Sequence, residues 1–157
     1  MRSVLFVCTA NICRSPMAEG VFRKLLASKK PDAQIEIDSV GTHDYHQGEP
    51  PFPAAVAAAR RRGYEIAHLV ARRVKPGDLD HFDMILAMDR ANLSHLRTIA
   101  PTRCKHKIEL LLEYGDKYHG KEVPDPYGKD DKAFETALDM IEDGCRGVTE
   151  LVTRLAR

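Results

Sequence analysis

Residues 7–16 read Val7-Cys8-Thr9-Ala10-Asn11-Ile12-Cys13-Arg14-Ser15-Pro16. The apolar run that ends at Cys8 predicts a strand buried on both faces of a parallel sheet. Ser15 and Pro16 fit the N-cap and the first position of a helix, so a tight loop must connect the two elements. A strand followed by a loop and a helix is the repeating unit of α/β folds, and this stretch therefore decides the fold class.

The remaining sequence continues the alternation of strands and helices. Further strands are expected at residues 34–40, 82–88 and 108–112, the first of them near the sheet edge. Helices are expected at residues 54–62, after the cap residue Asp89 with Leu93, Leu96 and Ile99 facing the core, and along an apolar stripe from Phe134 to Leu155. The pattern predicts a three-layer α/β/α fold with a central four-stranded parallel sheet and helices on both faces.

Composition limits the function classes. The 157 residues suit one domain over residues 1–157. The 24 basic and 23 acidic residues give a net charge of +1, so no global field favours nucleic acid or an anionic membrane. No segment is long and apolar enough for a membrane span, and the first residues do not read as a signal peptide. We therefore expect a cytoplasmic protein.

The cysteines and histidines do not show metal-ligand spacing. Four cysteines, at positions 8, 13, 104 and 145, lack a paired C-x-x-C pattern and are expected to be reduced. His43 and His46 lie three residues apart in a loop without two further ligands nearby, which favours a surface pair. We expect no metal and no other cofactor.

The loop between Cys8 and Arg14 has the composition of a phosphate cradle. Successive backbone N–H groups of Thr9, Ala10, Asn11, Ile12 and Cys13 in a curled loop form an anion nest, and the following helix adds its positive end. A guanidinium at position 14 binds two phosphate oxygens at once, which lysine does not.

Cys8 is the candidate nucleophile of this cradle. Cysteines near helix N-termini and cationic groups are largely thiolate near neutral pH. The Ser15 hydroxyl is placed to donate a hydrogen bond to the Cys8 sulfur. A buried structural cysteine is the plainer alternative, but the strand, the loop and the Ser-Pro helix start around Cys8 favour the catalytic reading.

The stretch Phe-Val-Cys-Thr-Ala-Asn-Ile-Cys-Arg-Ser-Pro-Met-Ala-Glu closely resembles the active-site sequence of low-molecular-weight protein tyrosine phosphatases. Four other blocks resemble that family in the same order: Ser39-Val40-Gly41-Thr42, His68-Leu69-Val70-Ala71-Arg72, Leu86-Ala87-Met88-Asp89-Arg90-x-Asn92 and Val123-Pro124-Asp125-Pro126-Tyr127-Gly128. The resemblance therefore extends through nearly the whole chain.

The resemblance implies a two-step reaction through a phosphocysteine on Cys8, with Asp125 as general acid and then general base. Two prolines, at positions 124 and 126, also favour Asp125 because they stiffen its loop. By the same resemblance, Asn11, Ser39 and His68 hold the loop by hydrogen bonds, and Asp89 orients Arg14 unless it is only a helix cap.

Tyr45 and Tyr127 resemble the aromatic walls that flank a substrate ring in this family, although ordinary loop packing would also explain them. The implied partner is a tyrosine-phosphorylated protein or peptide, and the expected state is a monomer or at most a weak dimer. Ala10 stands where many members have glycine, and Tyr45 where tryptophan is common. Only one tyrosine, Tyr127, replaces the tandem tyrosines of animal members.

Three other functions compete. An arsenate reductase would need relay cysteines near residues 82–89, where this chain has none. A protein-arginine phosphatase tends to carry threonine at the place of Ile12. A non-catalytic phosphate-binding or redox-sensing module would need neither the nucleophile nor the acid. Cys13 is either a partner for a reversible disulfide with Cys8 or a small buried side chain of the loop.

Overall fold

Strand β1 (Ser3–Cys8) is the centre of the fold, because its side chains alternate between two hydrophobic cores. Val4, Phe6 and Cys8 face one core, and Leu5 and Val7 face the other. All six residues of β1 are buried. A strand that is apolar on both faces requires cover on both sides, and this requirement produces three layers.

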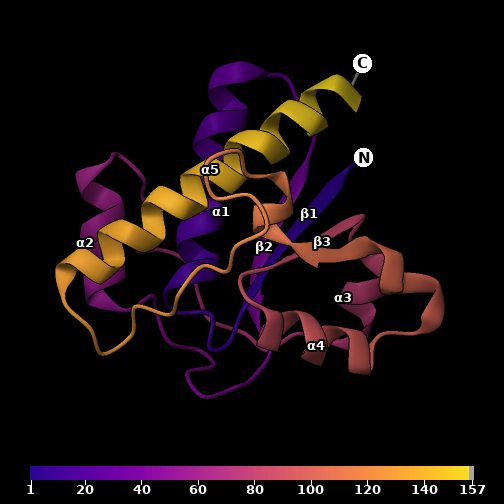
Figure 1. Cartoon of the computed structure of the whole chain (residues 1–157), viewed down its shortest axis with the longest axis horizontal. Coiled ribbons are helices and arrows are strands. Elements are labelled where there is room, and N and C mark those ends of the chain that lie inside the picture. The colour runs from indigo at the N-terminus through magenta and orange to yellow at the C-terminus, as the bar shows by residue number, and fades with distance from the viewer. Residues whose placement is uncertain (156–157) are drawn as a thin grey trace.

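The computed structural model describes residues 1–155 (Figure 1). The sheet contains β1, β2 (Glu36–Gly41), β3 (Met84–Ala87) and β4 (Ile108–Leu110) in the order β2-β1-β3-β4, and every pair is parallel. The order reverses direction at β1, since the chain places β2 on one side of β1 and β3 on the other. Ligands of open parallel sheets bind at such a reversal, beyond the carboxyl ends of the strands.

The two cores lie under different helices. Helices α1 (Arg14–Lys29), α2 (Pro53–Arg61) and α5 (Asp131–Leu155) cover the face with Phe6, and α3 (Pro76–His81) and α4 (Arg90–Ile99) cover the face with Leu5 (Figure 1). Two 3-10 segments, η1 (Thr102–Lys107) and η2 (Leu111–Tyr114), flank β4. The prediction of a three-layer α/β/α fold around a four-stranded parallel sheet is confirmed.

Close packing of α5 explains the glycines in its middle. A Cβ atom on Gly147 would lie 1.8 Å from the Tyr114 carbonyl oxygen, and one on Gly144 would lie 2.6 Å from the Leu111 side chain. These residues lower intrinsic helix propensity. They are needed because η2 passes directly against the helix.

The structure corrects several expected boundaries. Helix α1 begins at Arg14, with Cys13 at the N-cap and no side-chain cap, so the prediction of Ser15 as N-cap was wrong. The Ser15 hydroxyl is used toward Cys8 instead. Ile99 is 39% exposed because it is the last residue of α4, and Leu155, at the end of α5, is 54% exposed. Both residues were expected to face the core, and neither does.

Candidate active site

The loop between β1 and α1 lies at the carboxyl edge of the sheet and is anchored by three backbone hydrogen bonds. Thr42 N–H donates to the Cys8 carbonyl (2.9 Å), His43 N–H to that of Thr9 (3.0 Å), and Phe52 N–H to that of Ile12 (2.9 Å). Gly41 permits the close approach, because a Cβ atom there would lie 2.7 Å from the Thr9 oxygen. The loop is therefore fixed by the segment that follows β2.

The backbone N–H groups of residues 9–15 have no acceptor among residues 1–155. No side chain caps the first turn of α1, which starts in the same place. Buried N–H groups normally have partners, and a run of free ones beside a helix N-terminus is an anion-binding arrangement. Thr9, Ala10, Ile12, Cys13 and Arg14 also line one pocket with Cys8. The structure thus brings free N–H groups and the start of α1 together at one pocket.

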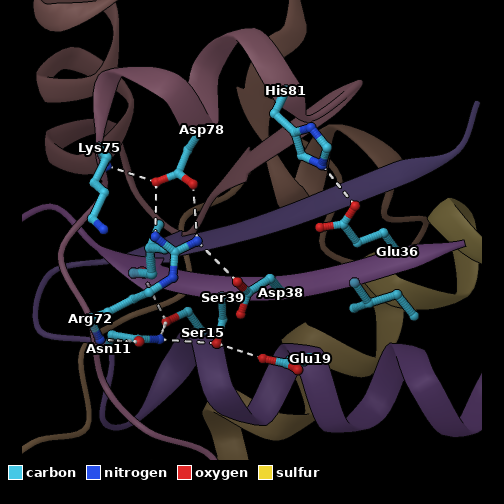
Figure 2. Close-up of polar contacts among 12 residues, drawn as sticks. Asn11, Ser15, Glu19, Glu36, Asp38, Ser39, Arg72, Lys75, Asp78 and His81 are labelled. Atoms are coloured by element: carbon cyan, nitrogen blue, oxygen red, sulfur yellow. Dashed lines mark hydrogen bonds and ion pairs between the residues drawn. The ribbon is translucent and has the colours of Figure 1, made fainter. Parts of the chain in front are cut away.

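Asn11 is the corner of the loop. Its φ of 59° is in the left-handed region, which asparagine tolerates better than most side chains. Its side-chain N–H groups donate to the hydroxyls of Ser15 (2.7 Å) and Ser39 (3.1 Å), and its oxygen accepts from the Arg72 backbone N–H at 3.1 Å (Figure 2). The side chain of Asn11 therefore ties the loop to α1, to β2 and to the segment before α3.

Cys8 lies at the floor of the pocket and is 3% exposed. Its sulfur is 3.0 Å from the Ser15 hydroxyl oxygen. The Ser15 hydroxyl also lies 3.3 Å from the Val40 carbonyl oxygen. The Ser15 hydroxyl is thus a hydrogen-bond partner of the sulfur, and Cys8 also lines the pocket.

Arg14 is 2% exposed and lines the same pocket as Cys8. Its Nη1 donates to the Asp89 carboxylate (2.7 Å) and to the Val123 carbonyl (2.9 Å). Burial by itself lowers the pKa of Arg14, but the negative charges of Cys8, Asp89 and Asp125 outweigh burial and raise it above its ordinary value. Arg14 therefore carries a fixed positive charge beside the sulfur.

Asp89 both contacts Arg14 and caps α4, the two alternatives considered for it. One carboxylate oxygen binds Arg14, and the other accepts the Asn92 backbone N–H at 2.8 Å, which caps α4. The Asn92 side chain is buried and donates to the Thr9 hydroxyl at 3.1 Å. Asn92 was missed in the sequence, because a polar residue in the first turn of a helix is ordinarily exposed.

Asp125 and the two tyrosines stand at the pocket mouth. The Asp125 carboxylate is 54% exposed and lies 3.9 Å from an Arg14 nitrogen. Tyr45 and Tyr127 are 67% and 49% exposed and line the pocket together with His46. The pocket thus has a polar floor and aromatic side chains at its opening. His46 had been expected only as a surface histidine.

Val123 fixes the segment that carries Asp125. The Val123 side chain is fully buried. Its N–H donates to the Met88 carbonyl at 2.9 Å, while its own carbonyl accepts from Arg14. Two residues later, the Asp125 carboxylate accepts the Tyr127 N–H at 3.1 Å. Backbone groups, which carry no sequence signature, therefore place the carboxylate over the cradle.

Cys13 is 4% exposed and is a free thiol in the structure, as is Cys8. Burial raises the pKa of the Cys13 thiol, and the negative charges of Cys8 and Asp125 raise it further, while Arg14 lowers it. These effects together favour the protonated form of the Cys13 thiol.

The expected contact of His68 with the loop is absent, and this prediction was wrong. The His68 side chain is exposed and has no hydrogen bond to the loop among residues 1–155. The adjacent Leu69 packs against the core, which turns His68 toward solvent. Ser39, in contrast, is buried and bonded to Asn11 as expected, and its hydroxyl donates to Glu19 at 2.8 Å.

Neither a metal site nor a membrane span is found in the described chain. Across residues 1–155, no three His, Cys, Asp or Glu side chains are grouped so that they could hold a metal ion. None of the helices in this range combines the length and the apolar character that crossing a membrane requires.

A doubly wound parallel sheet with a cysteine, an arginine and free backbone N–H groups at its carboxyl edge defines a class of α/β proteins with an oxyanion cradle. The family model described as "Low molecular weight phosphotyrosine protein phosphatase" matches residues 3–157. The chain belongs to this family and is a phosphatase.

Individual relatives agree over almost the whole length. The Bacillus subtilis low molecular weight protein-tyrosine-phosphatase YfkJ is 43% identical over 92% of both chains. The Homo sapiens low molecular weight phosphotyrosine protein phosphatase is 40% identical over 95% of this chain and 94% of its own. A crystal structure of an Entamoeba histolytica protein tyrosine phosphatase superposes with a TM-score of 0.93, at 33% identity and 98% coverage of both chains.

Proposed function

We propose that this phosphatase hydrolyses phosphotyrosine in proteins or peptides, and small aryl phosphates, through a phosphocysteine intermediate. One observation carries the proposal: a cysteine sulfur and a buried arginine face the same pocket, whose backbone N–H groups are free and whose mouth carries a carboxylate and two tyrosines. This arrangement supplies a nucleophile, a binding site for three phosphate oxygens and a proton donor in one place.

In the first step, the Cys8 thiolate attacks phosphorus as the bond to the aryl oxygen breaks. The free N–H groups of residues 9–15 and the Arg14 guanidinium hold the equatorial oxygens, where charge is concentrated in the transition state. Asp125 gives its proton to the departing oxygen, so the product leaves as a neutral phenol.

In the second step, Asp125 as a carboxylate takes a proton from water while the water oxygen bonds to phosphorus. The sulfur–phosphorus bond breaks, inorganic phosphate leaves and Cys8 returns to the thiolate. The Ser15 hydroxyl, 3.0 Å from the sulfur, stabilises this leaving thiolate by a hydrogen bond.

The aromatic preference rests on the mouth of the pocket. Tyr45 stacks on His43 with ring centroids 4.9 Å apart, and Tyr127 packs edge-on against Phe52 at 5.0 Å. These contacts support rigid walls for a flat ring above the cradle. The apolar Ile12 in the lining offers no hydrogen bond to the guanidinium of a phosphoarginine.

We further propose that residues 1–157 form one domain that acts as a monomer or at most a weak dimer in the cytoplasm, without a metal or other cofactor. Four free, buried cysteines suit a reducing compartment. The Cys8–Cys13 pair remains a candidate for a reversible disulfide, because both thiols line the same pocket.

The test compares phosphate release from phosphotyrosine, phosphoserine and phosphoarginine peptides. We expect release from phosphotyrosine alone, none in Cys8→Ser, and wild-type rates in the matched control Cys104→Ser. Asp125→Asn should lower kcat by about 10²- to 10⁴-fold on the phosphotyrosine peptide, whose phenol leaves poorly, and far less on p-nitrophenyl phosphate. Asp116→Asn provides the exposed aspartate control. Full activity in Cys8→Ser, or equal losses on both substrates in Asp125→Asn, would contradict the mechanism.

A further inference from the structure

Glu19 is a buried carboxylate that takes no part in the two proposed catalytic steps. It lies on α1, is 2% exposed, and its Oε2 accepts two hydrogen bonds from Arg23, at 3.0 Å from Nε and 2.8 Å from Nη2. Its other oxygen, Oε1, accepts the Ser39 hydroxyl at 2.8 Å (Figure 2). Burying a charge is costly unless the charge is paired and hydrogen-bonded, and Arg23 and Ser39 meet this requirement for Glu19.

The bond to Glu19 decides how the Ser39 hydroxyl is oriented. An ionised carboxylate paired with a guanidinium can only accept, and the single hydroxyl proton of Ser39 is therefore committed to Glu19. The Ser39 oxygen is then left as an acceptor, and it receives one side-chain N–H of Asn11 at 3.1 Å.

The Asn11 amide is oriented from its other end as well. Its oxygen accepts the Arg72 backbone N–H, so its nitrogen must face Ser15 and Ser39. Arg72 is held in turn by two hydrogen bonds to the Asp78 carboxylate, each of 3.0 Å (Figure 2). Both amide protons of Asn11 are thus assigned, one to each serine oxygen.

Ser15 consequently accepts from Asn11 and keeps its own proton to donate. Two acceptors are within reach: the Cys8 sulfur at 3.0 Å and the Val40 carbonyl at 3.3 Å. A negatively charged sulfur is the stronger acceptor, because hydrogen bonds to ions are about twice as strong as neutral ones.

We propose that Glu19 is a positioning residue of the phosphatase reaction, whose carboxylate acts through Ser39 and Asn11 to direct the Ser15 hydroxyl proton at the Cys8 sulfur. The inference rests on the proposed function, in which that sulfur is the nucleophile and then the leaving group. It assigns a catalytic consequence to a side chain that lies outside the pocket.

An amide at position 19 reverses the chain of donors. Because Arg23 requires an acceptor, a glutamine turns its oxygen to Arg23 and its NH₂ group to Ser39. The Ser39 hydroxyl then turns away from residue 19 and toward Asn11, where it meets another donor. The Asn11 amide is displaced, and Ser15 loses the bond that fixed its proton on the sulfur.

The experiment is a double-mutant cycle of Glu19→Gln and Ser39→Ala, assayed with p-nitrophenyl phosphate. Each single variant should lower kcat by about tenfold, the value of one hydrogen bond to an ion. KM should fall together with kcat, because slower hydrolysis of the phosphocysteine lowers both, and kcat/KM should change less than twofold because Arg14 is untouched. The double variant should be no slower than Ser39→Ala alone, since Glu19 acts through Ser39.

A pre-steady-state readout separates positioning from general damage. When the thiolate leaves poorly, hydrolysis of the phosphocysteine becomes limiting, so Glu19→Gln should release one equivalent of p-nitrophenol in a burst. The matched control is Asp143→Asn, which changes another buried carboxylate, one that binds backbone N–H groups of Asp116 and Tyr118 far from the pocket. It should lower stability to urea without lowering kcat or producing a burst.

Should Glu19→Gln not fold, Arg23→Gln takes its place, because the Arg23 side chain is 49% exposed and its replacement leaves no buried cavity. It should lower kcat about threefold, and not at all in the Ser39→Ala background. Kinetics of the Glu19 variant within twofold of wild type, or kcat losses that add in the cycle, overturn the inference. An inactive wild type, or an active Cys8→Ser, overturns the proposed function instead.

Discussion

Asp89 holds two different partners with its two carboxylate oxygens, and substitutions can separate them. Asp89→Ser keeps a hydroxyl at the N-cap of α4, where it accepts the Asn92 N–H, but is too short to reach Arg14. Asp89→Ala loses both contacts. We expect the two variants to share one kinetic defect and to differ in stability.

The magnitudes follow from the bonds. Loss of a hydrogen bond between ions is worth about 1.5–3 kcal/mol, or about 10- to 150-fold in kcat/KM. We expect a loss of kcat/KM near tenfold, because the Val123 carbonyl continues to hold the same Arg14 nitrogen at 2.9 Å. The cap is worth about 1 kcal/mol, so Asp89→Ala should melt about 2–4 °C below Asp89→Ser.

The assay measures kcat/KM on p-nitrophenyl phosphate and inhibition by inorganic phosphate, together with thermal unfolding of both variants. About a tenfold loss of kcat/KM in each, with weaker phosphate inhibition, is the expected result. Wild-type kcat/KM in Asp89→Ser with a loss only in Asp89→Ala would refute the reasoning. Asp89 would then act on the pocket by capping α4 rather than by orienting Arg14.

Two further predictions concern stability. Gly147→Ala places a methyl group 1.8 Å from the Tyr114 carbonyl oxygen, so α5 must shift, and urea unfolding should show a loss of about 1–3 kcal/mol or more. The pKa of His95 is lowered below 6.5 by burial and by the positive charges of His43 and Arg73. The unfolded chain therefore takes up that proton first, and stability should fall as pH drops below 6.5, less steeply in His95→Gln.

Each of these has its own control. Gly77→Ala alters a glycine of α3 whose added Cβ atom would meet no heavy atom within 4 Å, and it should leave stability nearly unchanged. A loss as large as that of Gly147→Ala would speak against the packing argument. For His95, equal slopes of unfolding free energy against pH in wild type and His95→Gln would show that another group controls the acid limb.

The layered fold was predictable because its signals are local. The all-apolar run of β1 and the alternation of strands and helices fix the number of layers, and the cap residue Asp89 marks the start of α4. Strands β3 and β4 are shorter than the predicted ranges 82–88 and 108–112. Their ladder pairing with neighbouring strands stops before the apolar sequence does. Helix α3 and both 3-10 segments were not predicted.

The residues of the candidate site also differ in how far local sequence predicts them. Cys8 and Arg14 are close in sequence, so their meeting in one loop follows from local geometry. Asp125 required the family resemblance, because its position depends on backbone bonds of Val123 made across the fold. The His68 assignment failed because hydrophobic burial of its neighbour Leu69 decides which way that segment faces.

Polar residues behind the loop were the hardest to foresee. Glu19 and Asn92 lie on helices, where charged and polar side chains are mostly solvated, yet both are 2% exposed. Their partners, Ser39 and Thr9, come from other elements. Only the tertiary arrangement shows that such residues support the site rather than the surface.

The two backbone bonds of Val123 also bear on motion. The segment that carries Asp125 is fastened to the end of the sheet by one bond and to Arg14 by the other. Lifting this segment away would break both bonds and expose a fully buried valine, so the open form costs several times the thermal energy. Substrate therefore enters a mouth that is already assembled, and turnover should not wait for the microsecond-to-millisecond closure of a lid.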